Sequence, residues 1–305
     1  MSILIDEHAR VVVQGIGNQG TFHAKRNQAY GTQVVAGTHP KKGGTTWDEL
    51  GVPVYARVAE AVEAEGANTS MIMVPAPFTK DAILEAFQAG IATIVCITEG
   101  VPVHDMAAVY NTLYPREFGG GFDKAGRPVL IGPNCPGVIS PGKANVGIIP
   151  GEITKPGNVG LVSRSGTLTY QIMHELHLAG IGISTCVGIG GDPIVGSDFG
   201  DIIPRFASDP DTEAIVFVGE IGGTEEQRVG EWIEANIPDT PVVAYVAGFT
   251  APPGKQMGHA GAIVREGGEG GETAADKKDA LEGMGISVGT NPSETAELMI
   301  ERLNA

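Results

Sequence analysis

The sequence predicts an α/β protein with two doubly wound domains, each built on a parallel sheet. Short apolar runs rich in Val and Ile alternate with amphipathic stretches along the chain, which is typical of parallel strands covered by helices on both faces. The 305 residues suit two domains of ordinary size. A Pro/Gly-rich connection at residues 132–157 interrupts the alternation, and we expect domains at residues 1–132 and 133–305.

In the first domain the apolar runs predict strands, and the amphipathic stretches between them predict helices. The predicted strands are Val11–Gln14, Gln33–Gly37, Ser70–Val74, Thr93–Ile97 and Val129–Ile131. The predicted helices are Phe22–Tyr30, Val58–Glu65, Lys80–Ala89 and Met106–Leu113. Because such sheets bind ligands at the carboxyl ends of their strands, we expect the loops there to carry the function.

The second domain repeats the same alternation. The predicted strands are Val159–Ser163, Ile183–Gly188, Ala214–Gly219, Pro241–Val246 and Ile286–Val288. The predicted helices are Leu168–Leu178, Asp201–Ala207, Glu225–Ala235, Ala274–Met284 and Pro292–Leu303. Two Gly-rich segments, 115–127 and 266–272, are predicted to be surface loops.

The composition excludes several classes of partner. Twenty Lys and Arg against 36 Asp and Glu leave a formal charge of −16, which argues against nucleic acid or an anionic membrane surface. No apolar run approaches the roughly 18 residues of a membrane span, and the acidic start of the chain does not resemble a signal peptide. The three cysteines indicate neither a disulfide framework nor a metal site. We therefore expect a cytoplasmic protein.

The first loop is a candidate phosphate site. Gly15, Gly17 and Gly20 match G-x-G-x-x-G between a strand and a helix, where glycines let a phosphate reach the N–H groups of the helix N-terminus. A dinucleotide site needs an acidic residue about 20 residues further on, but Lys41 and Lys42 follow the second strand instead. A lysine pair suits a ribose phosphate, so these residues leave NADP and coenzyme A both open.

Two segments of the second domain indicate chemistry. The turn after the strand Val159–Ser163 presents Ser165, Gly166 and Thr167 at a helix N-terminus, which is a candidate anion site as well as a helix cap. Small neighbours surround His259 in a long loop, and an imidazole so placed can act as nucleophile, general base or ligand.

Eight motifs distributed over almost the whole chain carry a family resemblance. They are Gly43–Thr46, Val74–Phe78, Ile97–Gly100, Gly132–Gly137, Ser163–Tyr170, Val187–Pro193, Gly219–Gly223 and Gly258–Ala262. With these motifs the sequence resembles the α subunits of succinyl-CoA synthetase and of relatives such as malate–CoA ligase. The resemblance implies a Rossmann-like domain that binds coenzyme A, followed by a flavodoxin-like ligase domain. It implies a ligase that converts succinyl-CoA, phosphate and a nucleoside diphosphate to succinate, CoA and the triphosphate.

The resemblance also implies roles for particular residues. His259 would be the residue phosphorylated during turnover, and Glu220 would orient its ring. Ser165–Thr167 would bind the phosphoryl group and Tyr170 the substrate. The coenzyme A site would be lined by Gly17, Asn18, Gln19, Lys42, Ile97, Thr98 and Glu99. A β subunit with an ATP-grasp fold would bind the Mg-nucleotide, in an αβ or α2β2 assembly, and no metal is expected on this chain.

The chain departs from the family in its first loop. Family members usually read Q-G-x-T-G-x-x-G there, whereas Gln14–Gly20 is one residue shorter and lacks the Thr that helps to hold the CoA phosphates. The longer segment 115–127, preceded by Tyr114, resembles an insertion of malate–CoA ligases. The remaining alternatives are therefore a malate–CoA ligase, an NADP-dependent oxidoreductase, and a CoA-binding protein without catalysis.

Overall fold

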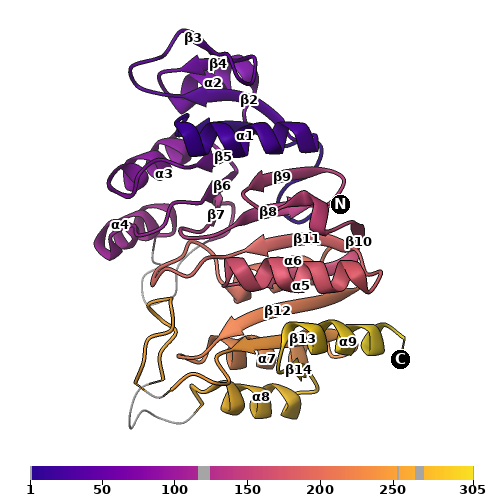
Figure 1. The fold of residues 1–305 in the computed structure, drawn as a ribbon. Coiled ribbons are helices and arrows are strands. Elements are labelled where there is room, and N and C mark those ends of the chain that lie inside the picture. The colour runs from indigo at the N-terminus through magenta and orange to yellow at the C-terminus, as the bar shows by residue number, and fades with distance from the viewer. Residues whose placement is uncertain (1, 116–123, 253, 265–270, 305) are drawn as a thin grey trace. The chain divides into compact units, whose positions relative to one another are not determined.

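The computed structural model describes residues 2–115, 124–252, 254–264 and 271–304. They form two compact units, and the predicted α/β class is confirmed (Figure 1). The first unit comprises Leu4–Ile149 with Ile194–Gly196, and the second comprises Pro150–Pro193 and Ser197–Ala305 together with the first three residues. Among the described residues, none of the helices is long and apolar enough to cross a membrane.

The sheet of the first unit runs in the order β3-β4-β2-β1-β5-β6-β7. Its strands are β1 (Arg10–Gln14), β2 (Gln33–Thr38), β3 (Thr45–Trp47), β4 (Val52–Tyr55), β5 (Thr69–Ile72), β6 (Thr93–Cys96) and β7 (Val129–Ile131). Its helices are α1 (Asn18–Tyr30), α2 (Val58–Glu65), α3 (Thr79–Gln88) and α4 (Val103–Leu113). Because β1 pairs in parallel with β2 on one side and β5 on the other, the connections diverge at its carboxyl end. Open α/β sheets bind ligands at such a switch point.

In the second unit the strands run in the order β14-β13-β12-β10-β11, and all of these pairs are parallel. The strands are β10 (Pro156–Ser163), β11 (Ile183–Gly188), β12 (Ala214–Glu220), β13 (Val242–Ala247) and β14 (Ser287–Gly289). The helices are α5 (Gly166–Leu178), α6 (Phe199–Ala207), α7 (Glu225–Asn236), α8 (Ala274–Gly283) and α9 (Pro292–Leu303). The chain passes from β10 to β11 and then returns to β12 on the other side of β10, so the switch point lies between β10 and β12.

The central strands are buried along their lengths, as the apolar runs predict. All residues of β6, β11 and β12 are buried, and the side chains of Val12, Ile94 and Phe217 have no exposed surface. Strands covered on both faces cannot alternate apolar and polar residues, which is why they read as continuous hydrophobic runs. This burial fixes the sheet positions from which the loops at the carboxyl edges project.

The prediction missed four short strands, and with them two antiparallel pairs. β3 pairs antiparallel with β4, and β8 (Gly137–Ser140) pairs antiparallel with β9 (Ala144–Gly147). The sequence of β3 is Thr45-Thr46-Trp47 and that of β4 contains Pro53, so neither forms an apolar run. The pair β8–β9 lies in the Pro/Gly-rich connection, where the many turn-forming residues indicate loops and mask the short strand pattern.

The β8–β9 hairpin follows residue 132 but belongs by its contacts to the first unit. The Asn27 Nδ2 donates to the Gly147 carbonyl at 3.1 Å, and the Thr32 hydroxyl donates to the Asn145 carbonyl at 2.9 Å. These bonds fasten the hairpin to α1 and to the residues directly after it.

A functional boundary at 132/133 stays a prediction. Most of the predicted loops 115–127 and 266–272 lies outside the described residues.

The tight turn between β1 and α1 generates a stability prediction. A Cβ at Gly20 would lie 1.8 Å from the Gly15 carbonyl oxygen, whereas a Cβ at Gly17 meets nothing within 4 Å. Gly20→Ala should therefore lower the free energy of unfolding by about 1–3 kcal/mol through forced backbone movement. The matched variant Gly17→Ala should lower the free energy of unfolding by under about 1 kcal/mol, because Ala is a poorer N-cap residue than Gly. Equal losses of the two variants in urea denaturation would contradict this account of the turn.

Candidate functional site

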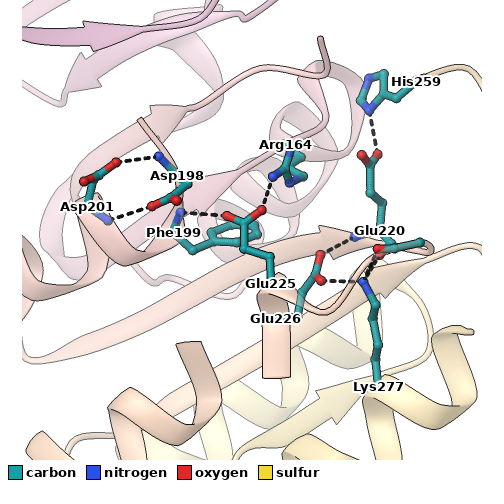
Figure 2. Close-up of polar contacts among 10 residues, drawn as sticks. Arg164, Asp198, Phe199, Asp201, Glu220, Glu225, Glu226, His259 and Lys277 are labelled. Atoms are coloured by element: carbon teal, nitrogen blue, oxygen red, sulfur yellow. Dashed lines mark hydrogen bonds and ion pairs between the residues drawn. The ribbon is translucent and has the colours of Figure 1, made fainter. Parts of the chain in front are cut away.

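A histidine and a glutamate meet at the carboxyl end of β12. Glu220 is the last residue of that strand, and its Oε2 lies 2.6 Å from the Nδ1 of His259. The His259 side chain is 23% exposed and the Glu220 side chain 11%, so the contact is sheltered while the ring still reaches solvent. Figure 2 shows the ring facing the carboxylate. The structure thus joins the two residues that the resemblance singled out.

The carboxylate sets the protonation of the ring. The hydrogen bond that the ring donates to Glu220 raises the pKa of His259 above its usual value, whereas burial and the Arg164 guanidinium act to lower it. The charges of Glu220 and Asp192 add to the raising effect. A carboxylate accepts but does not donate, so Nδ1 holds the proton and the neutral ring keeps its lone pair on Nε2. In this tautomer the unprotonated nitrogen of the ring is Nε2, the one that does not contact Glu220.

Two glycines allow the backbone to approach the histidine loop. A Cβ at Gly191 would lie 2.3 Å from the His259 Nε2, so the backbone after β11 passes directly against the ring. Gly222 has a φ of +89°, and a Cβ there would lie 2.1 Å from the Gly261 carbonyl oxygen. A side chain at either position would displace the His259 loop from the end of β12.

A cavity of about 280 Å³ opens beside Glu220, and Gly191 and Gly222 form part of its wall. This volume is slightly below the roughly 300–1,000 Å³ of typical ligand pockets. Its walls carry charges of both signs. Among them, Arg164 and Glu225 form an ion pair. The lining residues are Arg164, Gly191, Asp192, Pro193, Glu220, Gly222, Gly223, Thr224, Glu225, Glu226, Arg228 and Gly261.

The predicted anion site at α5 lies next to this position. β10 ends at Ser163, which pairs with Val218 of β12. The turn Ser165–Thr167 follows β10 and Glu220 ends β12, so both lie at the carboxyl ends of neighbouring strands at the switch point. Ser165 caps α5 by accepting from the Leu168 N–H at 3.4 Å, and the first turn of α5 contains no acidic residue. A helix N-terminus without an acid favours an anion. Tyr170, one turn further on, is half-buried, and its role as a substrate contact stays a prediction.

In the first unit, the Gly loop forms an open helix N-terminus. Gly17 is the N-cap of α1, which has no side-chain cap hydrogen bond among the described residues and no acid in its first turn. Gly17, Asn18 and Gln19 are all exposed. A Cβ at Gly15 would lie 2.7 Å from the backbone of Met73, so the turn packs closely against the segment after β5. The backbone N–H groups at this N-terminus are therefore accessible, and phosphate binding there stays a prediction.

The other predicted coenzyme A residues lie at the same edge of this sheet. Lys42 is exposed in the turn after β2, and Ile97–Glu99 follow β6. Thr98 is held by a hydrogen bond from its hydroxyl to the Val74 carbonyl at 2.7 Å. Among the described hydrogen bonds, none joins Lys42, Ile97–Glu99 and the Gly17 loop to one another. A ligand lying across the edge could contact all three segments.

The prediction missed the residues that support Glu220. Lys277 of α8 and Glu226 of α7 form a buried ion pair beneath the end of β12. The sequence did carry a signal for Lys277, because it lies between Ala274 and Leu281 at the i, i+3, i+7 spacing of the buried face of a helix. A lysine on such a stripe needs a buried partner.

Comparison with known proteins matches both units. A family described as CoA binding domain matches residues 6–100, and one described as CoA-ligase matches residues 162–286. The subunit alpha 2 of an ADP-forming succinate–CoA ligase from Archaeoglobus fulgidus is 56% identical, covering 99% of this chain and 100% of that protein. The alpha subunit of a malate–CoA ligase from Methylorubrum extorquens is 50% identical over 96% of this chain and 95% of its own length.

A solved structure agrees in fold. The ATP citrate lyase of Methanothrix soehngenii, determined with citrate and coenzyme A, aligns with 99% of this chain at a TM-score of 0.83 and 25% identity. This chain spans half of the length of that lyase chain. The two matched families, CoA binding domain and CoA-ligase, make the chain a CoA ligase of the acid–CoA class. The chain belongs to the family of acid–CoA ligase α subunits represented by the succinate–CoA ligases.

The Glu220–His259 contact generates a titration prediction. Glu220→Gln keeps the shape of the acceptor but removes its charge, so the pKa of His259 should fall, because burial and Arg164 still lower it. NMR titration of the ring signal, assigned with His259→Asn, measures the shift. Asp192→Asn is the matched control and should lower the pKa less, since Asp192 is the weakest of the named influences. An unchanged midpoint in Glu220→Gln would refute the role of this carboxylate.

Proposed function

We propose that this chain is the α subunit of an ADP- or GDP-forming succinate–CoA ligase and carries the phosphoryl group on His259. The observation that supports it best is the 2.6 Å contact between Glu220 and Nδ1, which leaves Nε2 as the nucleophile. Phosphate attacks the thioester carbonyl of succinyl-CoA, the C–S bond breaks, and the CoA thiolate takes up a proton. The products of this first step are succinyl phosphate and CoA.

In the second step, Nε2 of His259 attacks the phosphorus of succinyl phosphate. The bond to the acyl oxygen breaks, and succinate leaves as its carboxylate. The ring becomes cationic, and the Glu220 carboxylate on Nδ1 stabilises that charge without a change in geometry. The N-terminus of α5 at Ser165–Thr167 is proposed to bind the phosphoryl oxygens through its N–H groups. In the third step the phosphoryl group passes from Nε2 to a nucleoside diphosphate.

Coenzyme A is proposed to bind along the carboxyl edge of the first sheet. The open N-terminus at Gly17–Gln19 suits its diphosphate, and the exposed Lys42 suits its 3′-phosphate. Ile97, Thr98 and Glu99 would line the remainder of the site. The shortened Gly loop does not prevent this, because the uncapped helix supplies N–H donors from the backbone rather than from a threonine side chain.

The nucleotide is proposed to bind on a partner. As an α subunit, this chain requires a β subunit, to which we assign an ATP-grasp fold and the Mg-nucleotide site. The identity of the acid depends partly on that partner. Succinate is the first choice because relatives 56% and 53% identical bear the name succinate–CoA ligase, and malate is the second because a malate–CoA ligase is 50% identical.

Phosphorylation of His259 is the central prediction. When the chain and its β partner meet ³²P-labelled Mg-NTP, this chain should acquire a phosphate that is stable to base and labile to acid. His259→Asn should carry no label, because amide nitrogen does not accept a phosphoryl group. The label should also appear from succinyl-CoA with ³²P-phosphate, and malyl-CoA with phosphate tests the alternative acid. Full labelling of His259→Asn would exclude this mechanism.

The lysine after β2 generates a binding prediction. Lys42→Glu should weaken binding of coenzyme A by about 10-fold or more, because a charge pair is replaced by repulsion at a partly desolvated contact. Binding of dephospho-CoA, which lacks the 3′-phosphate, should change little. Calorimetry with both ligands measures the difference, and Lys41→Glu is the neighbouring control. Equal losses for the two ligands would remove Lys42 from the 3′-phosphate.

A further inference from the structure

Lys277 is a fully buried cation beneath the candidate site. It lies at the end of the first turn of α8, and its side chain has no exposed surface. Its Nζ donates to the Glu220 carbonyl at 2.7 Å, to the Gly222 carbonyl at 2.8 Å and to a carboxylate oxygen of Glu226 (Figure 2). An ammonium group has three protons, so all of its donors are satisfied. The cation is therefore bound to the backbone on both sides of Ile221.

Glu226 bonds both to Lys277 and to the backbone of Glu220. Its Oε1 accepts from the Glu220 N–H at 3.0 Å, while its Oε2 pairs with Lys277. The Glu226 side chain is 2% exposed. A Cβ at Gly219 would lie 2.4 Å from the Glu226 Oε1, so the preceding glycine leaves space for this carboxylate. Both backbone polar groups of Glu220 are thus held by one ion pair.

The start of α8 is tied to the loop after β12 by further bonds. The Gly222 N–H donates to the Glu272 carbonyl at 2.8 Å, and the Gln227 amide donates to the Gly271 carbonyl at 2.6 Å. Thr273 caps α8 in a capping box with Asp276. Lys277 consequently projects from a fixed helix end.

An ion pair in this position is not needed for stability alone. Replacing a buried pair with apolar side chains of similar volume is often neutral or stabilising, because desolvation offsets most of the Coulomb attraction. What apolar side chains cannot do is bond the N–H and the C=O of the same residue. These bonds restrict rotation of the Glu220 backbone and so the direction of its side chain. A shift of 1 Å would break the 2.6 Å contact with His259.

We propose that Lys277 and Glu226 are positioning residues for phosphoryl transfer: their ion pair fixes the backbone of Glu220 so that its carboxylate stays on Nδ1 of His259. Neither side chain reaches the reacting atoms. The inference rests on the proposed function of His259. It adds two supporting residues to that function, Glu226 of α7 and Lys277 of α8. They keep the Glu220 carboxylate in place while the ring becomes cationic.

The test uses the chain in complex with its β partner and three variants. Lys277→Met breaks the pair, and Lys277→Met with Glu226→Gln removes both charges at nearly constant volume. Lys278→Met is the matched control, because Lys278 is the next residue of α8 and bonds to Glu282 and the Val288 carbonyl rather than to Glu220. The initial rate of His259 phosphorylation, the KM for succinate and CoA, and the melting temperature are measured for each.

The double variant should melt below the wild type, because the Glu220 and Gly222 carbonyls lose their buried donor. It should remain folded and phosphorylate His259 about 10- to 100-fold more slowly, with KM values unchanged. Lys277→Met alone should show the same slowing together with a still lower melting temperature, because the Glu226 carboxylate is also left unpaired. Lys278→Met should behave as the wild type. A double variant that is folded and phosphorylated at the wild-type rate would overturn the proposal and leave the pair a purely structural role.

A second readout separates failure of this inference from failure of the proposed function. The pKa of His259, measured by NMR, should fall in the double variant as it does in Glu220→Gln, because the carboxylate no longer stays on Nδ1. Glu220, Arg164 and Asp192 are the charged groups that act on this ring, and only the first is displaced. If the wild type takes up no label, the proposed function fails, and the titration still decides the positioning role. An unshifted midpoint in the double variant counts against that role.

Discussion

The hydrogen bond between Glu220 and His259 is the contact on which the candidate site depends. It joins the last residue of a buried strand to a loop that follows the next strand of the sheet. The strand end is rigid because β12 is buried and paired on both sides. The loop supplies the ring, and Glu220 determines which nitrogen holds the proton. A rigid acceptor and a histidine on a loop are the arrangement that the proposed phosphoryl transfer requires.

The glycine content serves this geometry at specific positions. Gly191 lets the backbone pack against the His259 ring, and Gly222 lets the His259 loop pack against the end of β12. Gly219 leaves room for the Glu226 carboxylate. Each of these contacts is closer than any side chain would permit. Gly20 does the same in the first unit, where the turn before α1 closes on the Gly15 carbonyl. At these four positions, glycine is required because the backbone approaches another part of the chain closely.

The acidic character of the chain is compatible with phosphate-rich ligands. The first turns of α1 and α5 contain no acidic residue, so both helix N-termini keep their positive character. Near the site the acids are paired: Glu225 with Arg164, Glu226 with Lys277, and Glu220 with His259. The net charge of −16 describes the whole chain, whereas anion binding depends on backbone N–H groups and a few local cations.

Much of the fold was accessible from the sequence, because apolar runs report burial. The candidate roles of His259 and Glu220 came from the family resemblance of their motifs, since neither composition nor spacing assigns them. By itself the sequence determined the α/β class, most helices and central strands, and the motifs containing His259 and Glu220. Only the tertiary structure decided that β3, β4, β8 and β9 exist and that Lys277 and Glu226 hold the backbone of Glu220. The reason is physical: a buried ion pair depends on which helices converge beneath a strand end. Residues 226 and 277 are distant along the chain, so no local pattern links them.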